Sequence, residues 1–464
     1  MNIKHNDVNA PVLKRMLWNL SFHIREYRNL FFRTTKDSGE LCELYISGLL
    51  KTEHGRRNME RLHEELDMKG DGYQRIQQFI TDSTWDGFGL MREIAQNTSK
   101  LYSMQPCYDV KDVGYIFDES AHLKKGKESV GVSRQYAGVI GKVDNCQVGV
   151  YASLVWQNHT SIINCRLFLP ECWSADSAKC AKAGIPEDKC EHKTKLELAL
   201  DMLKADIAAG VRFGWVGGDG FYGHGCELNY AVEDMGLTFL FDVHNDQEIY
   251  EQEPEIFIPE KESVKGRIPT LPRTLAKSIK VKNYKAKLDE SQWETVEVRD
   301  TTKGKLKLSI HLMEVWVWDK KEERARKRVL VISRNMADNK IKYGLSNADI
   351  IKTPVKQFAF MQAQRYWIER SLQECKSELG MSDYQIRKWN GWHHHMALVM
   401  LALSFIVKER IKNQDNCPLL SYRDIRILII ALLTEDDLLI QKRMLQMQNR
   451  HRQREKDTQR YLKT

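Results

Sequence analysis

Residues 211–243 read VRFGWVGGDGFYGHGCELNYAVEDMGLTFLFDV, and their pattern decides the fold class. A short apolar run over 211–218 stops at Asp219. An amphipathic stretch over 226–235 follows, and a second apolar run covers 237–243. Short apolar runs on both sides of a helical pattern are typical of two strands joined by a helix. The stretch therefore predicts a strand–helix–strand part of a mixed α/β sheet.

The residues before this stretch extend the same sheet. β-rich runs lie at 114–118, 147–156 and 160–169, and the last two are separated by a short polar turn that predicts a hairpin. A helix is predicted at 195–208 from its leucine spacing. The order β-β-β-α-β-α-β indicates a hairpin that leads into a crossover sheet.

Helical patterns dominate both ends of the chain. Residues 10–105 contain several amphipathic helices with polar breaks. About 100 residues after 243 hold β runs at 295–299, 307–318 and 328–333, which favours an inserted β-rich domain over a loop. Helices return after 345, and we expect the polar tail from 441 to be only partly helical. The expected domains are 1–105, 106–243, 244–345, 346–412 and 413–464.

The charge of this 464-residue chain is concentrated in two segments. The formal net charge is +8. Between Lys261 and Lys287 nine Lys/Arg face one acid, and between Lys442 and Lys463 eight face two. The rest is mildly acidic, so a polyanionic partner is indicated, although two solvated surfaces would give the same pattern. The N-terminal residues contain no apolar h-region of a signal sequence, and no apolar run reaches the roughly 20 residues of a membrane span, so we expect a soluble intracellular protein.

The ten cysteines are expected to be free thiols. None forms a C-x2-C pair, and a chain of this size needs no disulfides. Cys172, Cys180, Cys190 and His192 are a weak zinc candidate, because their spacing fits no usual zinc finger.

Three carboxylates are candidates for a metal centre. Asp118 and Asp219 are each expected to close a strand, although an acid at this position is more often a turn or N-cap residue. On the helix predicted at 358–380, Glu369 borders an apolar stripe, and an exposed ion pair with Arg365 is the alternative. Three converging carboxylates would suit two Mg²⁺ or Mn²⁺ ions, as used in phosphodiester chemistry.

Cations accompany these acids along the chain. Arg365 and Lys376 flank Glu369, and they would hold or neutralise phosphate. More cations follow Asp118 in the next loop, and they are Lys124, Lys125, Lys127 and Arg134.

These residues carry a resemblance to bacterial insertion-sequence transposases of the DDE class, in the branch with a YREK signature and a β insertion. IFDES at 116–120 and KKGKESVGVSRQY at 124–136 resemble the first-Asp block of that family, and NCQVGV at 145–150 follows it. GIPED at 184–188 and GDGFYG at 218–223 resemble the second-Asp region. The last block comprises RYWIE at 365–369, KSELG at 376–380 and WNGWHHH at 389–395.

The last block resembles the signature Y-x2-R-x3-E-x6-K, with one departure. Arg365, Glu369 and Lys376 occupy their positions, but Gln362 stands where the family has tyrosine. The departure puts in doubt any DNA contact that the tyrosine makes, and it leaves the metal centre unaffected.

The resemblance implies an RNase H-like catalytic domain interrupted by a β insertion, with Asp118, Asp219 and Glu369 as the metal-binding triad and two Mg²⁺ or Mn²⁺ ions. The helical N-terminal domain would recognise terminal inverted repeats. The protein would cleave double-stranded DNA at transposon ends and join the 3′-OH ends to target DNA. It would act as a homodimer in the cytoplasm, at the nucleoid, without a membrane partner.

Other residues are assigned by weaker arguments. Trp367 either contacts DNA or packs. Consecutive histidines such as 393–395 point about 100° apart on a helix and cannot share one ion, so packing or phosphate contact is expected. Four lysines of the predicted insertion are expected to grip DNA, namely Lys277, Lys280, Lys282 and Lys285.

Two alternatives to a transposase stay open. One is a metal-dependent nuclease, or a domesticated relative, that cuts DNA without joining it. The other is a DNA-binding regulator without catalysis, against which the complete acidic triad argues.

Overall fold

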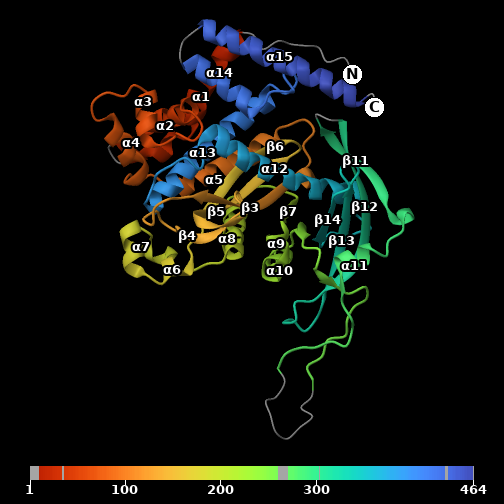
Figure 1. Cartoon of the computed structure of the whole chain (residues 1–464). Coiled ribbons are helices and arrows are strands. Elements are labelled where there is room, and N and C mark those ends of the chain that lie inside the picture. Colours follow the sequence, from red (N-terminus) through yellow and green to blue (C-terminus); the bar gives the residue numbers. More distant parts are fainter. Residues whose placement is uncertain (1–9, 34–35, 260–269, 302–303, 434–436, 463–464) are drawn as a thin grey trace. The chain divides into compact units, whose positions relative to one another are not determined.

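The computed structural model describes residues 10–33, 36–259, 270–301, 304–433 and 437–462. It divides into two compact units, and Figure 1 labels their elements. Unit 1 comprises Met1–Val113, Asp118–Phe213 and Tyr366–Lys456, and unit 2 comprises Gly114–Phe117, Gly214–Arg365 and Asp457–Thr464. Strand β3 (Val113–Leu123) and helix α12 (Val355–Leu379) each contribute residues to both units.

The predicted N-terminal helices are present in unit 1. The first helix ends at Glu26 and is followed by a 3₁₀ turn, η1 (Arg28–Phe31). A two-stranded ribbon, β1 (Phe32–Arg33) and β2 (Lys36–Asp37), comes next. The helices are α1 (Ala10–Glu26), α2 (Gly39–Lys51), α3 (Met59–Glu65), α4 (Gly72–Thr81) and α5 (Gly87–Ser103).

Helix α13 (Trp389–Lys412) forms the centre of unit 1. It is buried along most of its length and packs against α4, α5 and strand β6 (His159–Leu167). Helix α14 (Tyr422–Leu433) packs against α13 and α1. The tail beyond it is one helix, α15 (Asp437–Leu462), so the prediction of a partly helical tail was wrong for the described residues.

The sheet of unit 1 contains the second half of β3 together with β4 (Ser133–Ala137), β5 (Lys142–Trp156) and β6. The predicted hairpin is confirmed, because β5 and β6 pair antiparallel up to Trp156↔His159. Strand β4 also pairs antiparallel with β5. Half-buried and exposed residues alternate along β4, so it contains no apolar run from which the strand could be predicted. Short connecting elements are η2 (Val110–Asp112), α6 (Glu171–Ser174), α7 (Ser177–Ala183), η3 (Glu187–Lys189) and the predicted α8 (Lys195–Ala208).

Unit 2 contains the strand–helix–strand part predicted from residues 211–243. Strand β7 (Trp215–Gly218) pairs parallel with the start of β3 and with β8 (Phe239–Val243). Helices α9 (Gly220–His224) and α10 (Cys226–Asp234) connect β7 to β8. Parallel neighbours need such a crossover, which the sequence pattern indicated.

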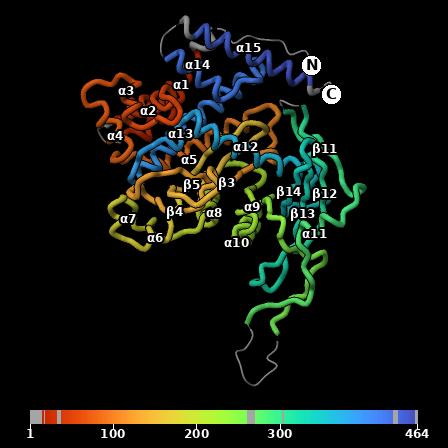
Figure 2. The backbone as a smooth tube through the Cα atoms, viewed as in Figure 1, coloured from red at the N-terminus to blue at the C-terminus, as the bar shows by residue number. Residues whose placement is uncertain are grey.

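The strands after β8 extend the sheet of unit 2, as the side-by-side strands in Figure 2 show. Strand β14 (Ile341–Ser346), which was not predicted, pairs antiparallel with β8. The order continues through β13 (Arg326–Asn335), β12 (Gly304–Val317) and β11 (Glu294–Thr301). A separate core under these strands includes Ile249, Val281 and Leu330. The smaller elements are β9 (Glu248–Ile249), β10 (Ile279–Lys280), α11 (Val281–Lys285) and η4 (Glu290–Gln292).

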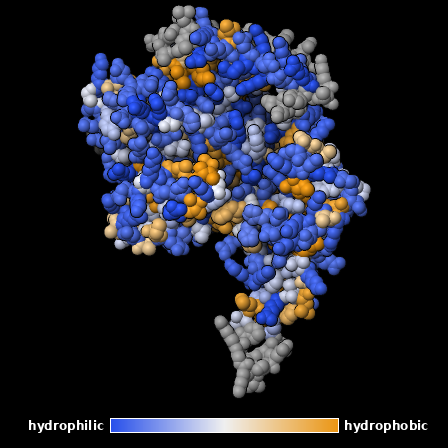
Figure 3. All heavy atoms as spheres, in the orientation of Figure 1, coloured by the Kyte–Doolittle hydropathy of each residue, from blue (hydrophilic) through white to orange (hydrophobic). Residues whose placement is uncertain are grey.

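The protein is therefore mixed α/β, with extensive sheet structure and helices at both ends of the chain, as predicted. That residues 244–345 form an independent domain stays a prediction. In the described part of the chain no helix combines the length and apolar character needed to cross a bilayer. The molecular face in Figure 3 is mostly hydrophilic, with its apolar side chains in separate patches.

Candidate functional site

Asp118 lies inside strand β3, whereas the sequence analysis placed it at the strand end. The strand continues to Leu123 because Ser120, Ala121 and His122 are buried and keep the backbone in the sheet. Asp118 and Glu119 are half-buried, whereas the other residues of the strand are buried except for the exposed Leu123 at its end. The Asp118 Oδ1 atom accepts a hydrogen bond from the Glu119 amide at 2.8 Å, so the carboxylate is oriented by its own backbone.

Lys376 places the second half of α12 close to Asp118 within unit 1. Burial lowers the pKa of Lys376, and the charge of Asp118 opposes this shift. Glu369 is exposed and lies seven residues before Lys376 on the same helix. Because seven residues make about two helical turns, Glu369 and Lys376 share one face of α12. That face of α12 therefore carries the Glu369 carboxylate and also Lys376, whose pKa is affected by the charge of Asp118.

The apolar stripe predicted on α12 is confirmed, and two acids outside the stripe are half-buried. Ile368, Leu372, Cys375 and Leu379 are all buried, as predicted. Glu374 and Glu378 lie outside this stripe: Glu374 pairs with Arg370 at 2.9 Å, and Glu378 with Arg426 at 3.3 Å. The helix is thus packed on more than one side.

Asp219 follows β7 directly and caps helix α9, so its predicted position at a strand end is confirmed. Its Oδ1 atom accepts a hydrogen bond from the Phe221 amide at 3.0 Å. The surrounding glycines permit close packing, since a Cβ atom on Gly223 would collide with the carbonyl oxygen of Asp242. Asp219 therefore has an N-cap role in the structure, which leaves room for a second role as a ligand.

Asp242 is a candidate site residue of unit 2 that the sequence analysis missed. It is largely buried on β8, where Arg365 forms an ion pair with it at 2.9 Å and Lys342 at 4.0 Å. Burial raises the pKa of Asp242, the cations oppose this shift, and the negative charge of Asp219 adds to it. An acid within the apolar run FLFDV was the available signal. Buried, charge-coupled carboxylates of this kind are typical of functional sites.

Gln362, which stands at the tyrosine position of the signature, also contacts this carboxylate. Its side chain is buried, and Nε2 donates a hydrogen bond to Asp242 Oδ1 at 3.3 Å. The glutamine at this signature position therefore makes a hydrogen bond to the Asp242 carboxylate. A cavity of about 400 Å³ opens beside the cluster, lined by Asp242, Val243, His244, Asn245, Ile341, Lys342, Tyr343 and Arg365.

Most of the proposed DNA-binding cations are exposed, and their contact with DNA stays a prediction. Lys124 differs: its ammonium donates to the Tyr384 carbonyl at 2.8 Å and lies 3.5 Å from the centre of that ring. Trp367 is half-buried and packs edge-on against Tyr366. Lys285 is half-buried, whereas the exposed members of the set are Lys125, Lys127, Arg134, Lys277, Lys280 and Lys282. Lys261, Lys265 and Arg267 of the basic segment lie outside the described residues.

The histidine triplet packs in the interior of unit 1. The rings of His393, His394 and His395 are buried, and each points to a different partner. His394 lies between the carbonyl oxygens of Ile80 and Trp85, at 2.8 and 2.9 Å. This arrangement supports packing over the phosphate contact.

Two of the ten cysteines depart from the expected free thiols. Cys180 and Cys190 form a disulfide that closes the segment between α7 and η3. The disulfide was not predicted, because the spacing of the two cysteines alone does not show that the short loop between them brings their sulfur atoms together. With both sulfurs bonded to each other, the weak zinc candidate loses two of its four ligands.

The acidic triad is divided between the units. Asp118 and Glu369 belong to unit 1, and Asp219 belongs to unit 2. Among the described residues no three His, Cys, Asp or Glu side chains form a group that could hold a metal ion. The donor set itself suits Mg²⁺ or Mn²⁺, because it consists of carboxylate oxygens. A three-carboxylate centre stays a prediction.

The sequence comparisons identify the class of protein that carries these residues. The family profile described as DDE superfamily endonuclease matches residues 26–305, more than half of the chain, so the chain belongs to that family. The matched region includes both Asp118 and Asp219.

A curated relative gives a more specific likeness. The chain is 24% identical over 318 residues to the "Probable transposase for insertion sequence element IS701" of Microchaete diplosiphon. The alignment covers 68% of this chain and 69% of that relative.

Proposed function

We propose that the protein is the transposase of an insertion sequence. It binds the inverted-repeat ends of its element as a homodimer, cleaves the DNA strands there and joins the 3′-OH ends to target DNA. The membership of the DDE superfamily endonucleases and the likeness to a transposase support this function. The finer assignment to the YREK branch is supported by the spacing of Arg365, Glu369 and Lys376.

The strand register is the observation that carries the catalytic assignment. In the parallel pair of β3 and β7, Ile116 is opposite Gly217. Asp118 and Asp219 each follow two residues after that pair along their chains. Corresponding positions on parallel neighbours point to the same face of a sheet, which supports joint action of the two carboxylates. Glu369, on the α12 face that also carries Lys376, completes the proposed set.

Asp118, Asp219 and Glu369 would hold two Mg²⁺ or Mn²⁺ ions. Such ions would activate a water molecule or a 3′-OH group and would stabilise the leaving oxygen. The other residues have positioning roles in this proposal. Lys376 offsets the negative charge around Asp118, and Asp242 orients Arg365 near Asp219. The site acts on double-stranded DNA in the cytoplasm, at the nucleoid.

Cleavage of DNA that carries the ends of the element tests the function. With Mg²⁺, the protein is expected to release cut ends and to join them to a target plasmid. Asp118→Asn, Asp219→Asn and Glu369→Gln should each reduce cleavage at least about 10²-fold, the order expected when a charge-stabilising group is lost. Asp246→Asn, which removes an exposed acid of unit 2, is the matched control.

Each outcome decides between functions. Unchanged cleavage in any of the three variants would overturn the role of that residue. Cut ends without joining would indicate a nuclease, and DNA binding without cleavage under Mg²⁺ or Mn²⁺ would indicate a regulator.

A further inference from the structure

Helix α15 is held to unit 1 along one face by a buried acid. Asp424 of α14 is 2% exposed, and it accepts hydrogen bonds from Arg450 at 2.7 Å and His451 at 3.1 Å. Burial of Asp424 opposes its ionisation, but these donors outweigh it and hold the pKa of the carboxyl below its ordinary value. Met447 is buried on the same side of the helix. These contacts fix which side of α15 faces the protein.

The opposite side of α15 carries cations that this acid does not neutralise. With His451 at 0° and 100° per residue, Met447 lies at about −40°, whereas Arg452, Lys456 and Lys442 lie at about 100°, 140° and 180°. These three side chains are exposed, and the structure gives none of them an ion pair with another described residue. We call Lys442, Arg452 and Lys456 the outward face of α15.

The two acids of this part of the helix lie outside the outward face. Glu455 is at about 40° and Asp457 at about 240° on the same wheel. Asp457 is paired with Arg460 at 3.9 Å, which is why Arg460 is left out of the face. The outward face is therefore a cationic strip about 21 Å long, at 1.5 Å per residue.

We propose that the outward face of α15 binds the sugar–phosphate backbone of double-stranded DNA without reading its sequence. Duplex DNA carries about one negative charge per 1.7 Å of its axis, so a strip of this length meets several phosphates. A lipid surface is a poor match, because an interfacial helix needs an apolar face and Leu445 is the large apolar residue on this side. The proposal rests on the proposed function for the choice of DNA as polyanion.

This surface is separate from the matched endonuclease region and from the candidate catalytic residues. The family match ends at residue 305, and α15 begins at Asp437. The role of the outward face is thus to add affinity for the DNA next to the reacting ends, and it contributes nothing to the chemical step.

Binding to a 30-bp duplex of arbitrary sequence, without divalent metal, tests the proposal. The triple variant Lys442→Gln, Arg452→Gln, Lys456→Gln is compared with the intact chain between about 50 and 200 mM salt. Each lost phosphate contact lowers the slope of log K against log[salt] by about 0.9, so a decrease of about 2–3 is expected, with roughly 10–100-fold weaker binding. Circular dichroism and thermal unfolding should be unchanged, because the side chains are exposed.

The matched control removes three exposed cations from other helices of unit 1, Arg92→Gln, Lys100→Gln and Lys204→Gln. An unchanged salt slope in the α15 variant would overturn the proposal, and so would an equal loss in the control, which would show an effect of net charge alone. End cleavage by the intact chain is measured separately. Its presence together with an unchanged slope would reject the outward face while leaving the transposase function intact.

Discussion

At the scale of single residues, the pairing of Asp242 with Arg365 shows how a charged group is kept inside unit 2. A carboxylate loses hydration when it is buried, which raises its pKa unless a nearby cation compensates. Arg365 is the nearest cation to Asp242, whereas Lys342 is farther away and half-exposed. Both cations oppose the rise in the pKa of Asp242, but Arg365 also contacts the carboxylate at 2.9 Å, so removal of Arg365 should cost more stability than removal of Lys342.

Arg365→Gln is predicted to lower the free energy of unfolding by roughly 2–4 kcal/mol, because it leaves Asp242 buried without the cation that contacts it directly. The pKa of Asp242 is already raised in the folded state, so its folding contribution becomes less favourable as the pH rises through that pKa. The deficit of the variant should be largest where Asp242 is ionised in the folded state, and it should shrink as the pH falls through the folded pKa. Urea unfolding at pH 7 and at a series of lower pH values measures it.

Lys342→Gln is the matched control for this prediction, since a half-exposed pair at 4.0 Å contributes at most about 1 kcal/mol. Equal deficits in the two variants would contradict the assignment, as would a deficit for Arg365→Gln that does not change with pH.

Lys124 gives a second prediction at this scale. Burial lowers its pKa to about 7 in the folded state. The unfolded chain then binds more protons between about pH 7 and 10, so stability rises with pH by at most about 1.4 kcal/mol per unit from this group. Lys124→Met should remove that part of the slope. Urea midpoints at pH 7, 8 and 9 check this result, with the exposed neighbour variant Lys125→Met expected to keep the wild-type slope.

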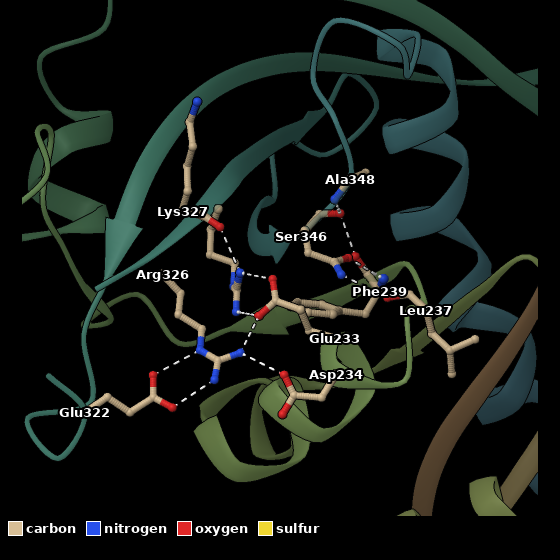
Figure 4. Close-up of polar contacts among 11 residues, drawn as sticks. Glu233, Asp234, Leu237, Phe239, Glu322, Arg326, Lys327, Ser346 and Ala348 are labelled. Atoms are coloured by element: carbon tan, nitrogen blue, oxygen red, sulfur yellow. Dashed lines mark hydrogen bonds and ion pairs between the residues drawn. The ribbon is translucent and has the colours of Figure 1, made fainter. Parts of the chain in front are cut away.

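At the scale of secondary-structure elements, an ion-pair network joins α10 to β13 and its preceding turn within unit 2 (Figure 4). Glu233 accepts hydrogen bonds from Arg328 at 2.7 and 2.8 Å and from Arg326 at 2.7 Å. Arg328 is buried, and Glu233 is the carboxylate that pairs with its guanidinium in the part of the chain that the structure describes. Burial opposes ionisation of Glu233, but the two arginines outweigh it and hold its pKa below the ordinary value.

Glu233→Gln is therefore predicted to lower the free energy of unfolding by roughly 3–5 kcal/mol at pH 7, since it leaves a buried guanidinium without its counter-charge. The stabilisation from an acid with a lowered pKa is present above its unfolded pKa and disappears as the pH falls through the folded one. The two proteins should thus converge in acid. Asp234→Asn, next along α10 and exposed, should cost less than about 1 kcal/mol; a comparable loss there would contradict the network.

The elements that the sequence predicted well are those whose signals are local. Helix α8 begins after a capping box of Thr194 and Glu197, and both its predicted ends agree with the structure. Strand β14 was missed because IKYGLS contains a glycine and a lysine within six residues and pairs through partners far away in sequence. Asp242 was missed for the same reason, since its significance comes from Arg365 and Lys342, which are distant in the chain. Local pattern does not encode such tertiary contacts.

At the scale of the whole molecule, the net charge of +8 has a distribution that bears on DNA binding. In the basic tail, Asp424 pairs with Arg450 and His451, whereas it does not neutralise the cations of the outward face of α15. In unit 2, Val281 and Tyr284 anchor α11 in the core that includes residues of β12, β13 and β14, while Lys280 and Lys282 remain exposed beside them. A small anchored element that presents cations to solvent is suited to backbone contact with DNA.

Neutralising Lys277, Lys280, Lys282 and Lys285 together, each to glutamine, is predicted to weaken binding to duplex DNA and to flatten its salt dependence. The slope of log K against log[salt] should fall by up to about 0.9 for each lysine that contacts a phosphate, and binding should weaken to a similar extent for all sequences. The control changes four lysines of unit 2 that are already paired with acids, Lys320, Lys321, Lys340 and Lys352. Both variants change the net charge equally, so an equal slope change would contradict a specific role for the α11 region. A selective change would instead show that DNA is gripped at the lysines around α11, because the total charge is the same in both proteins.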